Sequence, residues 1–158
     1  MPYPASLIAY AFVKKGIEEG KPVTQMKLQK MVYFAHGYHL AKYKKPLIAE
    51  LFEAWKFGPV IPSIYQTYKL YGSGKITDDS LIPDLGHLRK DASNLDSNAF
   101  DAINYTWAVT KDIPSGSLSA WSHKDGSPWF DAFKPDVNSI PIKNESISQY
   151  FTNLLAAS

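Results

Sequence analysis

Apolar residues recur every three or four positions near the start of the chain and predict two helices there. The first covers residues 5–19, with Pro4 and Gly20 at the ends where these residue types are common. The second follows Thr24, a candidate N-cap, and ends near Tyr43. Its predicted apolar face is Leu28, Met31, Val32, Ala35, Tyr38 and His39. We therefore expect an amphipathic second helix that buries one face.

The pattern then changes to strict alternation, which predicts a short β element. Residues 51–57 alternate across two faces and contain good strand formers. Gly58-Pro59 predicts the end of this strand. Pro62 suits the first turn of a helix that runs to Tyr71 and closes at Gly72. Residues 75–77 are a candidate return strand.

The second half of the chain is mainly helical in pattern. Residues 78–95 predict a surface loop with room for one short helix, and residues 100–109 predict a longer helix. A short helix is expected over Leu118–Ser122, capped by Ser115 or Ser117, another at Ser127-Pro128, and a last one capped by Asn144. The predicted fold is mainly α (α+β), a compact helical domain of about six helices with a small antiparallel β element, in one domain over residues 1–158.

The amino-acid composition excludes several classes of function for this chain. The chain has no cysteine, which excludes disulfides, thiolate catalysis and cysteine-ligated zinc. Lys and Arg number 17 against 15 Asp and Glu, and a net charge of only +2 is not typical of a dedicated nucleic-acid binder. No signal-peptide pattern and no apolar run of membrane-spanning length are present, and we expect a cytoplasmic protein without membrane contact.

Four short patterns superficially resemble chemical sites. His36 and His39 share a helix face at metal-ligand spacing, but no glutamate lies between them as in the zinc-protease helix. Residues 122–125 hold a serine, a histidine and an aspartate, yet triads are defined by geometry rather than adjacency. Residues 72–75 lack most of a phosphate loop, and Lys42 to Lys45 form a basic helix end. We expect no catalytic residue, no metal and no cofactor.

The tryptophans leave two interpretations open. Trp55, Trp121 and Trp129 each lie beside a predicted turn or short helix. They either pack in the core or line a groove for a protein partner, since tryptophan is common at interface hot spots.

The block from Met26 to Val60, with its MKLQK, YFAHG and FEAWKFGPV segments, resembles the Panacea family, also called SocA-like. The similarity returns at Leu118-Ser119, Ser122-His123, Gly126–Trp129 and Tyr150-Phe151, and so spans nearly the whole chain. Residues 78–98 match nothing distinctive.

The resemblance implies an antitoxin-type protein, not an enzyme, that neutralises a cognate protein toxin by direct binding. It further implies a prophage or toxin–antitoxin locus and help in presenting the toxin to a protease. It carries no catalytic residues. The motif residues proposed for partner binding are Lys27, Gln29, Lys30, Tyr33, His36, Trp55, His123 and Trp129, and those assigned to structure are Gly58, Pro59 and Pro128. The alternative is a regulatory or DNA-contacting prophage protein, which the near-neutral charge disfavours.

Overall fold

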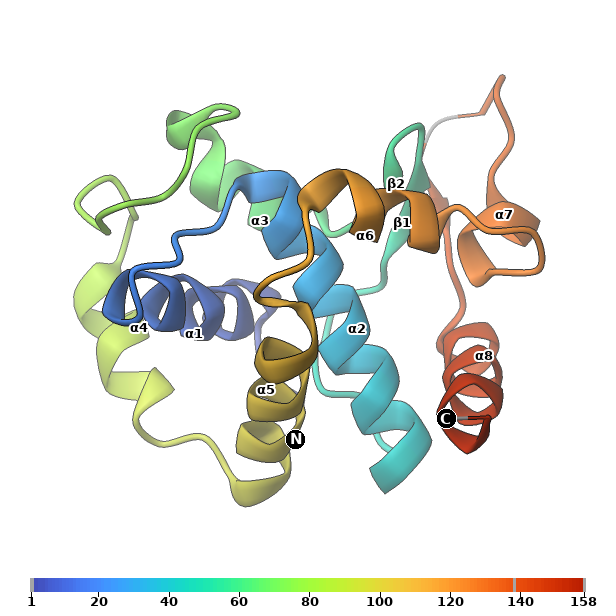
Figure 1. Ribbon diagram of the computed structural model, residues 1–158, viewed down its shortest axis with the longest axis horizontal. Helices are drawn as coiled ribbons and strands as arrows, with labels where there is room; N and C mark the ends of the chain where they lie inside the picture. Colours follow the sequence, from blue (N-terminus) through green and yellow to red (C-terminus); the bar gives the residue numbers. More distant parts are fainter. Residues whose placement is uncertain (1, 138, 158) are drawn as a thin grey trace.

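The computed structural model describes residues 2–137 and 139–157, and it is built mainly from helices (Figure 1). The described residues contain eight α-helices: α1 (Ala5–Glu18), α2 (Gln25–Tyr43), α3 (Pro62–Tyr68), α4 (Leu85–Ala92), α5 (Ser97–Thr110), α6 (Ser115–Ser122), α7 (Pro128–Ala132) and α8 (Asn144–Ala156). A 3-10 helix, η1 (Lys69–Tyr71), and three strands, β1 (Glu53–Trp55), β2 (Gly58–Val60) and β3 (Ile140–Pro141), complete this part. The predicted fold class, mainly α with a small antiparallel β element, is confirmed.

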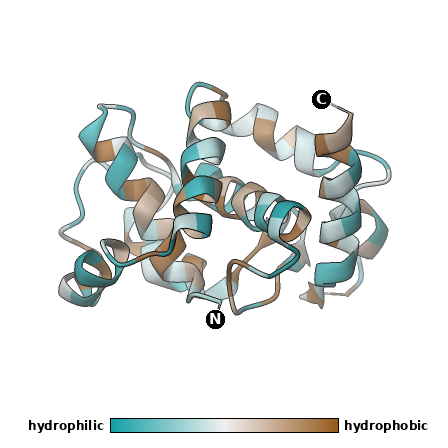
Figure 2. Cartoon of the chain, turned by 90° about the horizontal axis from the view of Figure 1, so that it is seen from below, coloured by the Kyte–Doolittle hydropathy of each residue, from teal (hydrophilic) through white to brown (hydrophobic). Residues whose placement is uncertain are grey.

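Helix α2 runs through the middle of the molecule. Figure 1 shows α1 and α4 on one side of it and α8 on the other, and α2 packs most extensively on α8 and α5. Thr24 caps its start as predicted, because its hydroxyl accepts a hydrogen bond from the Lys27 N–H at 3.2 Å. Most other helices alternate hydrophobic and hydrophilic positions, as helices with one buried face do (Figure 2).

The prediction of a single apolar face on α2 was wrong. Every residue from Leu28 to Leu40 is buried, including polar side chains on the face expected to meet solvent. A helix covered on all sides must satisfy its polar groups internally. At Gly37 the covering helix comes so close that a Cβ would lie 2.2 Å from the Phe151 ring of α8.

The β element is a three-stranded sheet in the order β2-β1-β3. Strand β1 is shorter than the predicted 51–57, and Gly58-Pro59 forms part of β2 instead of ending the sheet. The turn lies at residues 56–57, because Trp55 pairs with Gly58. Pro59 is tolerated because β2 is an edge strand, where a missing N–H interrupts no ladder. The return strand proposed at residues 75–77 is wrong: β3 pairs with β1, and Lys75 only bridges Thr24.

The helix ends in the second half match the sequence unevenly. Ser127 caps α7 as predicted, by accepting from the Phe130 N–H at 3.1 Å. Neither Ser115 nor Ser117 caps α6, which begins after Pro114. Asn144 starts α8 without capping it, because its side-chain oxygen bonds His36 instead.

Candidate functional site

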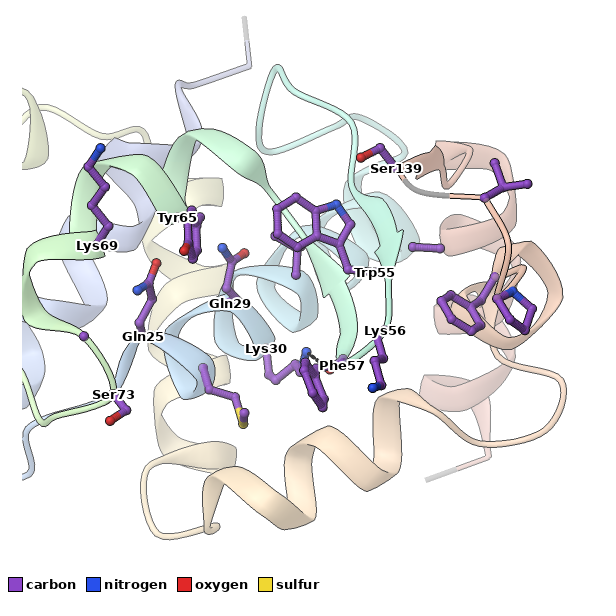
Figure 3. A pocket seen from close by; sticks show the side chains of 17 residues that line it. Gln25, Gln29, Lys30, Trp55, Lys56, Phe57, Tyr65, Lys69, Ser73 and Ser139 are labelled. Carbon is purple, nitrogen blue, oxygen red and sulfur yellow. Dashed lines mark hydrogen bonds between the residues drawn. The ribbon is translucent and has the colours of Figure 1, made fainter.

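A groove of about 1160 Å³ opens beside the N-terminal turns of α2 (Figure 3). Its floor is the start of α2 and the β1–β2 hairpin, and its walls are the α3–η1 segment on one side and Phe133, Pro135, Val137 and Ser139 on the other. The described lining residues are Gln25, Met26, Gln29, Lys30, Ala54, Trp55, Lys56, Phe57, Val60, Tyr65, Lys69, Gly72, Ser73, Phe133, Pro135, Val137 and Ser139. We call this feature the groove.

Large apolar side chains are exposed along the groove. Phe57 is 63% exposed, and Met26, Tyr65 and Val137 are 45%, 45% and 48% exposed. Monomeric proteins rarely leave several such side chains together in a concavity unless something binds there. The groove is therefore a candidate binding surface.

The charges of the groove are all of one sign. Lys30, Lys56 and Lys69 line it, and none of its described lining residues is acidic. The whole chain is nearly neutral, so this positive character is local. It favours a partner that brings negative charge.

Lys30 is the most unusual of these residues. The residue is only 2% exposed, and its Nζ donates to the Phe57 carbonyl at 2.8 Å. Within residues 2–137 and 139–157, no carboxylate oxygen lies within 4.0 Å of that nitrogen to form an ion pair. Burial lowers the pKa of Lys30 from its ordinary value of 10.5 to about 8. At neutral pH Lys30 therefore remains a buried cation, and its ammonium has N–H donors beyond the one that bonds the Phe57 carbonyl.

The close contact between the β1–β2 hairpin and Lys30 requires a glycine at position 58. A Cβ at Gly58 would lie 2.4 Å from Lys30 Nζ and 3.1 Å from the Ser122 hydroxyl oxygen. The backbone φ of Gly58 is +121°, which side chains other than glycine rarely adopt. Gly58 therefore lets the ammonium reach the carbonyl of the turn.

The neighbouring polar residues of the motif, Gln29 and Lys27, form hydrogen bonds to the backbone of other segments. Gln29 is 4% exposed, and its side-chain amide both accepts from the Ile61 N–H at 2.9 Å and donates to the Ile61 carbonyl at 3.1 Å. Lys27 donates to the Lys111 carbonyl at the end of α5, at 2.6 Å. Both side chains fasten α2 to its surroundings.

Two motif residues, His36 and Tyr33, lie in the core and do not line the groove. His36 is fully buried between the Ile48 N–H, which donates to its Nδ1 at 3.4 Å, and the Asn144 side-chain oxygen, 2.9 Å from its Nε2. Burial lowers the pKa of His36 to about 4, so the ring is neutral. Tyr33 is 1% exposed, and its hydroxyl has no hydrogen-bond partner among the described residues. Neither side chain lines the groove, and their assignment to partner binding stays a prediction.

The motif aromatics fall on either side of the hairpin. Trp55 lines the groove, and its indole N–H donates to Glu53 at 2.9 Å. Trp129 is 8% exposed and donates to the Trp55 carbonyl from behind. His123 packs edge-on against Trp129 at a ring separation of 4.0 Å and lies outside the groove. Trp129 and His123 thus contact the hairpin, Pro128 begins α7, and Trp55 lines the groove.

Several groove residues were missed in the sequence. Phe57 and Lys56 form the hairpin turn, and Tyr65, Lys69 and Val137 come from segments that we interpreted only as structure or irregular chain. An adjacent Lys-Phe pair in a two-residue turn is a signal that could have pointed to an exposed aromatic ring. The groove forms only when segments some 80 residues apart in the sequence come together, and no local sequence pattern indicates its walls.

Sites of other kinds are not apparent in the described part of the chain. No cluster of three or more histidine, aspartate or glutamate side chains with metal-binding geometry is found there. None of the described helices is long and apolar enough to span a membrane.

Comparisons with known proteins agree with the motif. No solved structure matches the chain. It is 32% identical to Antitoxin SocA of Caulobacter vibrioides (strain NA1000 / CB15N) over 127 residues, which cover 79% of this chain and 68% of that relative. The family model described as "Antitoxin SocA-like, Panacea domain" matches residues 28–130, more than half of the chain, and the chain therefore belongs to the SocA-like Panacea domain family.

Proposed function

We propose that this protein is an antitoxin that neutralises a cognate protein toxin by binding it directly, without catalysis, and that the groove is the toxin-binding surface. The observation that carries the proposal is the groove itself. It gathers exposed Phe57, Tyr65 and Met26 around a set of lysines in a member of an antitoxin family. A prophage or toxin–antitoxin locus, a cytoplasmic location and delivery of the toxin to a protease belong to the same proposal.

Co-expression provides the test. A toxin candidate from the gene's neighbourhood is expressed from an inducible promoter with and without the protein, and growth and complex formation on size exclusion are measured. We expect the protein to restore growth and to co-elute with the toxin. Toxicity that persists, together with separate elution, contradicts the proposal.

A matched pair of variants assigns the surface. Tyr65→Asp places a charge on a 45% exposed ring in the groove, and Phe100→Asp does the same to a 40% exposed ring on α5, outside it. Both substitutions act on exposed side chains, so both variants should fold. Loss of neutralisation with Tyr65→Asp alone supports the groove, whereas equal effects point to another surface.

A further inference from the structure

The Lys30 ammonium in the groove has no carboxylate partner among the described residues. An ammonium has three N–H donors, and Lys30 uses one of them on the Phe57 carbonyl. Its burial keeps the remaining donors from bulk water, which makes an unpaired cation costly. Evolution can retain such a group for a function that a packed apolar side chain would not serve.

A second unsatisfied group lies at the same end of α2. The Gln25 side-chain oxygen is buried and, within the described residues, has no hydrogen-bond partner. Gln25 lines the groove about one helical turn before Lys30 (Figure 3). The floor of the groove thus also holds a hydrogen-bond acceptor without a partner, which an N–H group of a bound peptide could satisfy.

We propose that the groove binds a peptide segment of the toxin in which an aspartate or glutamate side chain pairs with Lys30 Nζ while adjacent apolar side chains pack on Trp55 and Tyr65. This inference rests on the proposed function and names the recognition chemistry. The two aromatic rings lie 6.0 Å apart at a tilt of 53°, which leaves faces available for aliphatic or aromatic side chains. Lys56 and Lys69, both exposed at the rim, favour further acidic residues in the segment.

Other ligand classes fit the groove less well. The terminal carboxylate of a peptide is commonly held by successive backbone N–H groups, but the backbone atom that faces Lys30 is the carbonyl of Phe57. A single-stranded nucleic acid requires a track of cations along its phosphates, and the described groove has three separated lysines and no arginine. An acidic side chain needs only the one donor cluster that Lys30 offers.

Pairing with a carboxylate would change the protonation of Lys30. Its pKa of about 8 would rise, because an opposite charge stabilises the ammonium. Binding above pH 8 should then take up protons. The titratable groups on the described surrounding elements are Lys56, Lys69, Tyr65, Glu53, whose carboxylate accepts from the Trp55 indole, and His123, which contacts the hairpin from outside the groove.

The test is a double-mutant cycle on the purified complex. Calorimetry measures the toxin affinity of wild type, Lys30→Met and, as a control, Lys14→Met, an exposed lysine on α1. Each toxin aspartate and glutamate is replaced in turn by asparagine or glutamine. We expect Lys30→Met to weaken binding on the order of 10- to 100-fold, and Lys14→Met to leave it unchanged. One toxin carboxylate should matter to the wild type and not to Lys30→Met.

Proton uptake gives an independent readout. Titrations at pH 8.5 in buffers of different ionisation enthalpy should show uptake for the wild type and less for Lys30→Met. Equal affinities of wild type and Lys30→Met, or the absence of a coupled toxin carboxylate, overturn the inference and leave the proposed function intact. Displacement of the toxin from the groove by a single-stranded oligonucleotide also overturns it. A wild-type protein that binds no toxin overturns both.

Discussion

Replacing Lys30 by methionine should stabilise the protein at neutral pH. Methionine is similar in length to lysine and can fill the buried space of the Lys30 side chain without a charge. The Phe57 carbonyl would keep the Ser119 hydroxyl as a donor at 3.4 Å. The substitution therefore removes a buried cation without leaving its acceptor unpaired.

The magnitude follows from the pKa of Lys30. A fall from 10.5 to about 8 on folding corresponds to about 3 kcal/mol of unfavourable charge burial at pH 7, at about 1.4 kcal/mol per unit. Between pH 8 and 10.5 the unfolded chain binds more protons than the folded one at this site. Wild-type stability should therefore rise with pH in that window, as the folded lysine becomes neutral. The advantage of Lys30→Met should be largest below pH 8 and should vanish near pH 10.5.

Urea denaturation at a series of pH values, followed by tryptophan fluorescence, measures this difference. Lys14→Met, which removes an exposed lysine on α1, is the control and should follow the wild type at every pH. The reasoning is refuted if Lys30→Met is less stable than the wild type by more than about 1 kcal/mol at pH 7. It is also refuted if the difference does not change with pH.

Three further predictions concern the scaffold. Gly37→Ala should destabilise the protein by about 2–4 kcal/mol in urea titrations, because the added methyl group would lie 2.2 Å from the Phe151 ring, and this clash outweighs the preference of about 1 kcal/mol for alanine in a helix. Gly86→Ala on α4 is the control and should not destabilise the protein, because nothing lies within 4 Å of the added methyl group. Gln29→Leu should cost about 1–3 kcal/mol, because it leaves the buried N–H of Ile61 unpaired, while the Ile61 carbonyl keeps the N–H groups of Ile64 and Tyr65 as donors, and a neutral effect would contradict that assignment. Ser127→Ala should lower stability by about 1 kcal/mol through loss of the α7 cap, and an unchanged melting temperature would show that the cap is dispensable.

The sequence predicted what depends on near neighbours in the polypeptide. Helix ends marked by Thr24 and Ser127 were correct, because capping is decided within three residues. The hairpin was misplaced because Gly58-Pro59 usually interrupts strands, whereas here Gly58 fits closely against Lys30 and Pro59 lies in an edge strand. The burial of α2 on every side could not be seen locally, since it requires α5 and α8, which come some 60 and 110 residues later.

The candidate site was recovered in part. Lys30 and Trp55 were selected and line the groove, while Tyr33 and His36 were selected with them and are buried. Lys30 and Tyr33 are both almost fully buried, but only Lys30 lines the groove, and the sequence motif does not distinguish them. The opposite wall, formed by Phe133, Pro135, Val137 and Ser139, lies about 100 residues from Lys30 in the sequence and was not foreseen.

The division of the groove between a buried helix and surface segments suggests how proteins of this architecture can acquire new partners. The cation belongs to the N-terminal half of α2, a helix whose side chains are mostly buried in the core. The walls belong to η1 with its following turn and to Phe133, Pro135, Val137 and Ser139, most of which are exposed. Under the proposed function, exchanging these two short stretches of sequence should change the partner that is bound, while Lys30 and the rest of α2 stay the same.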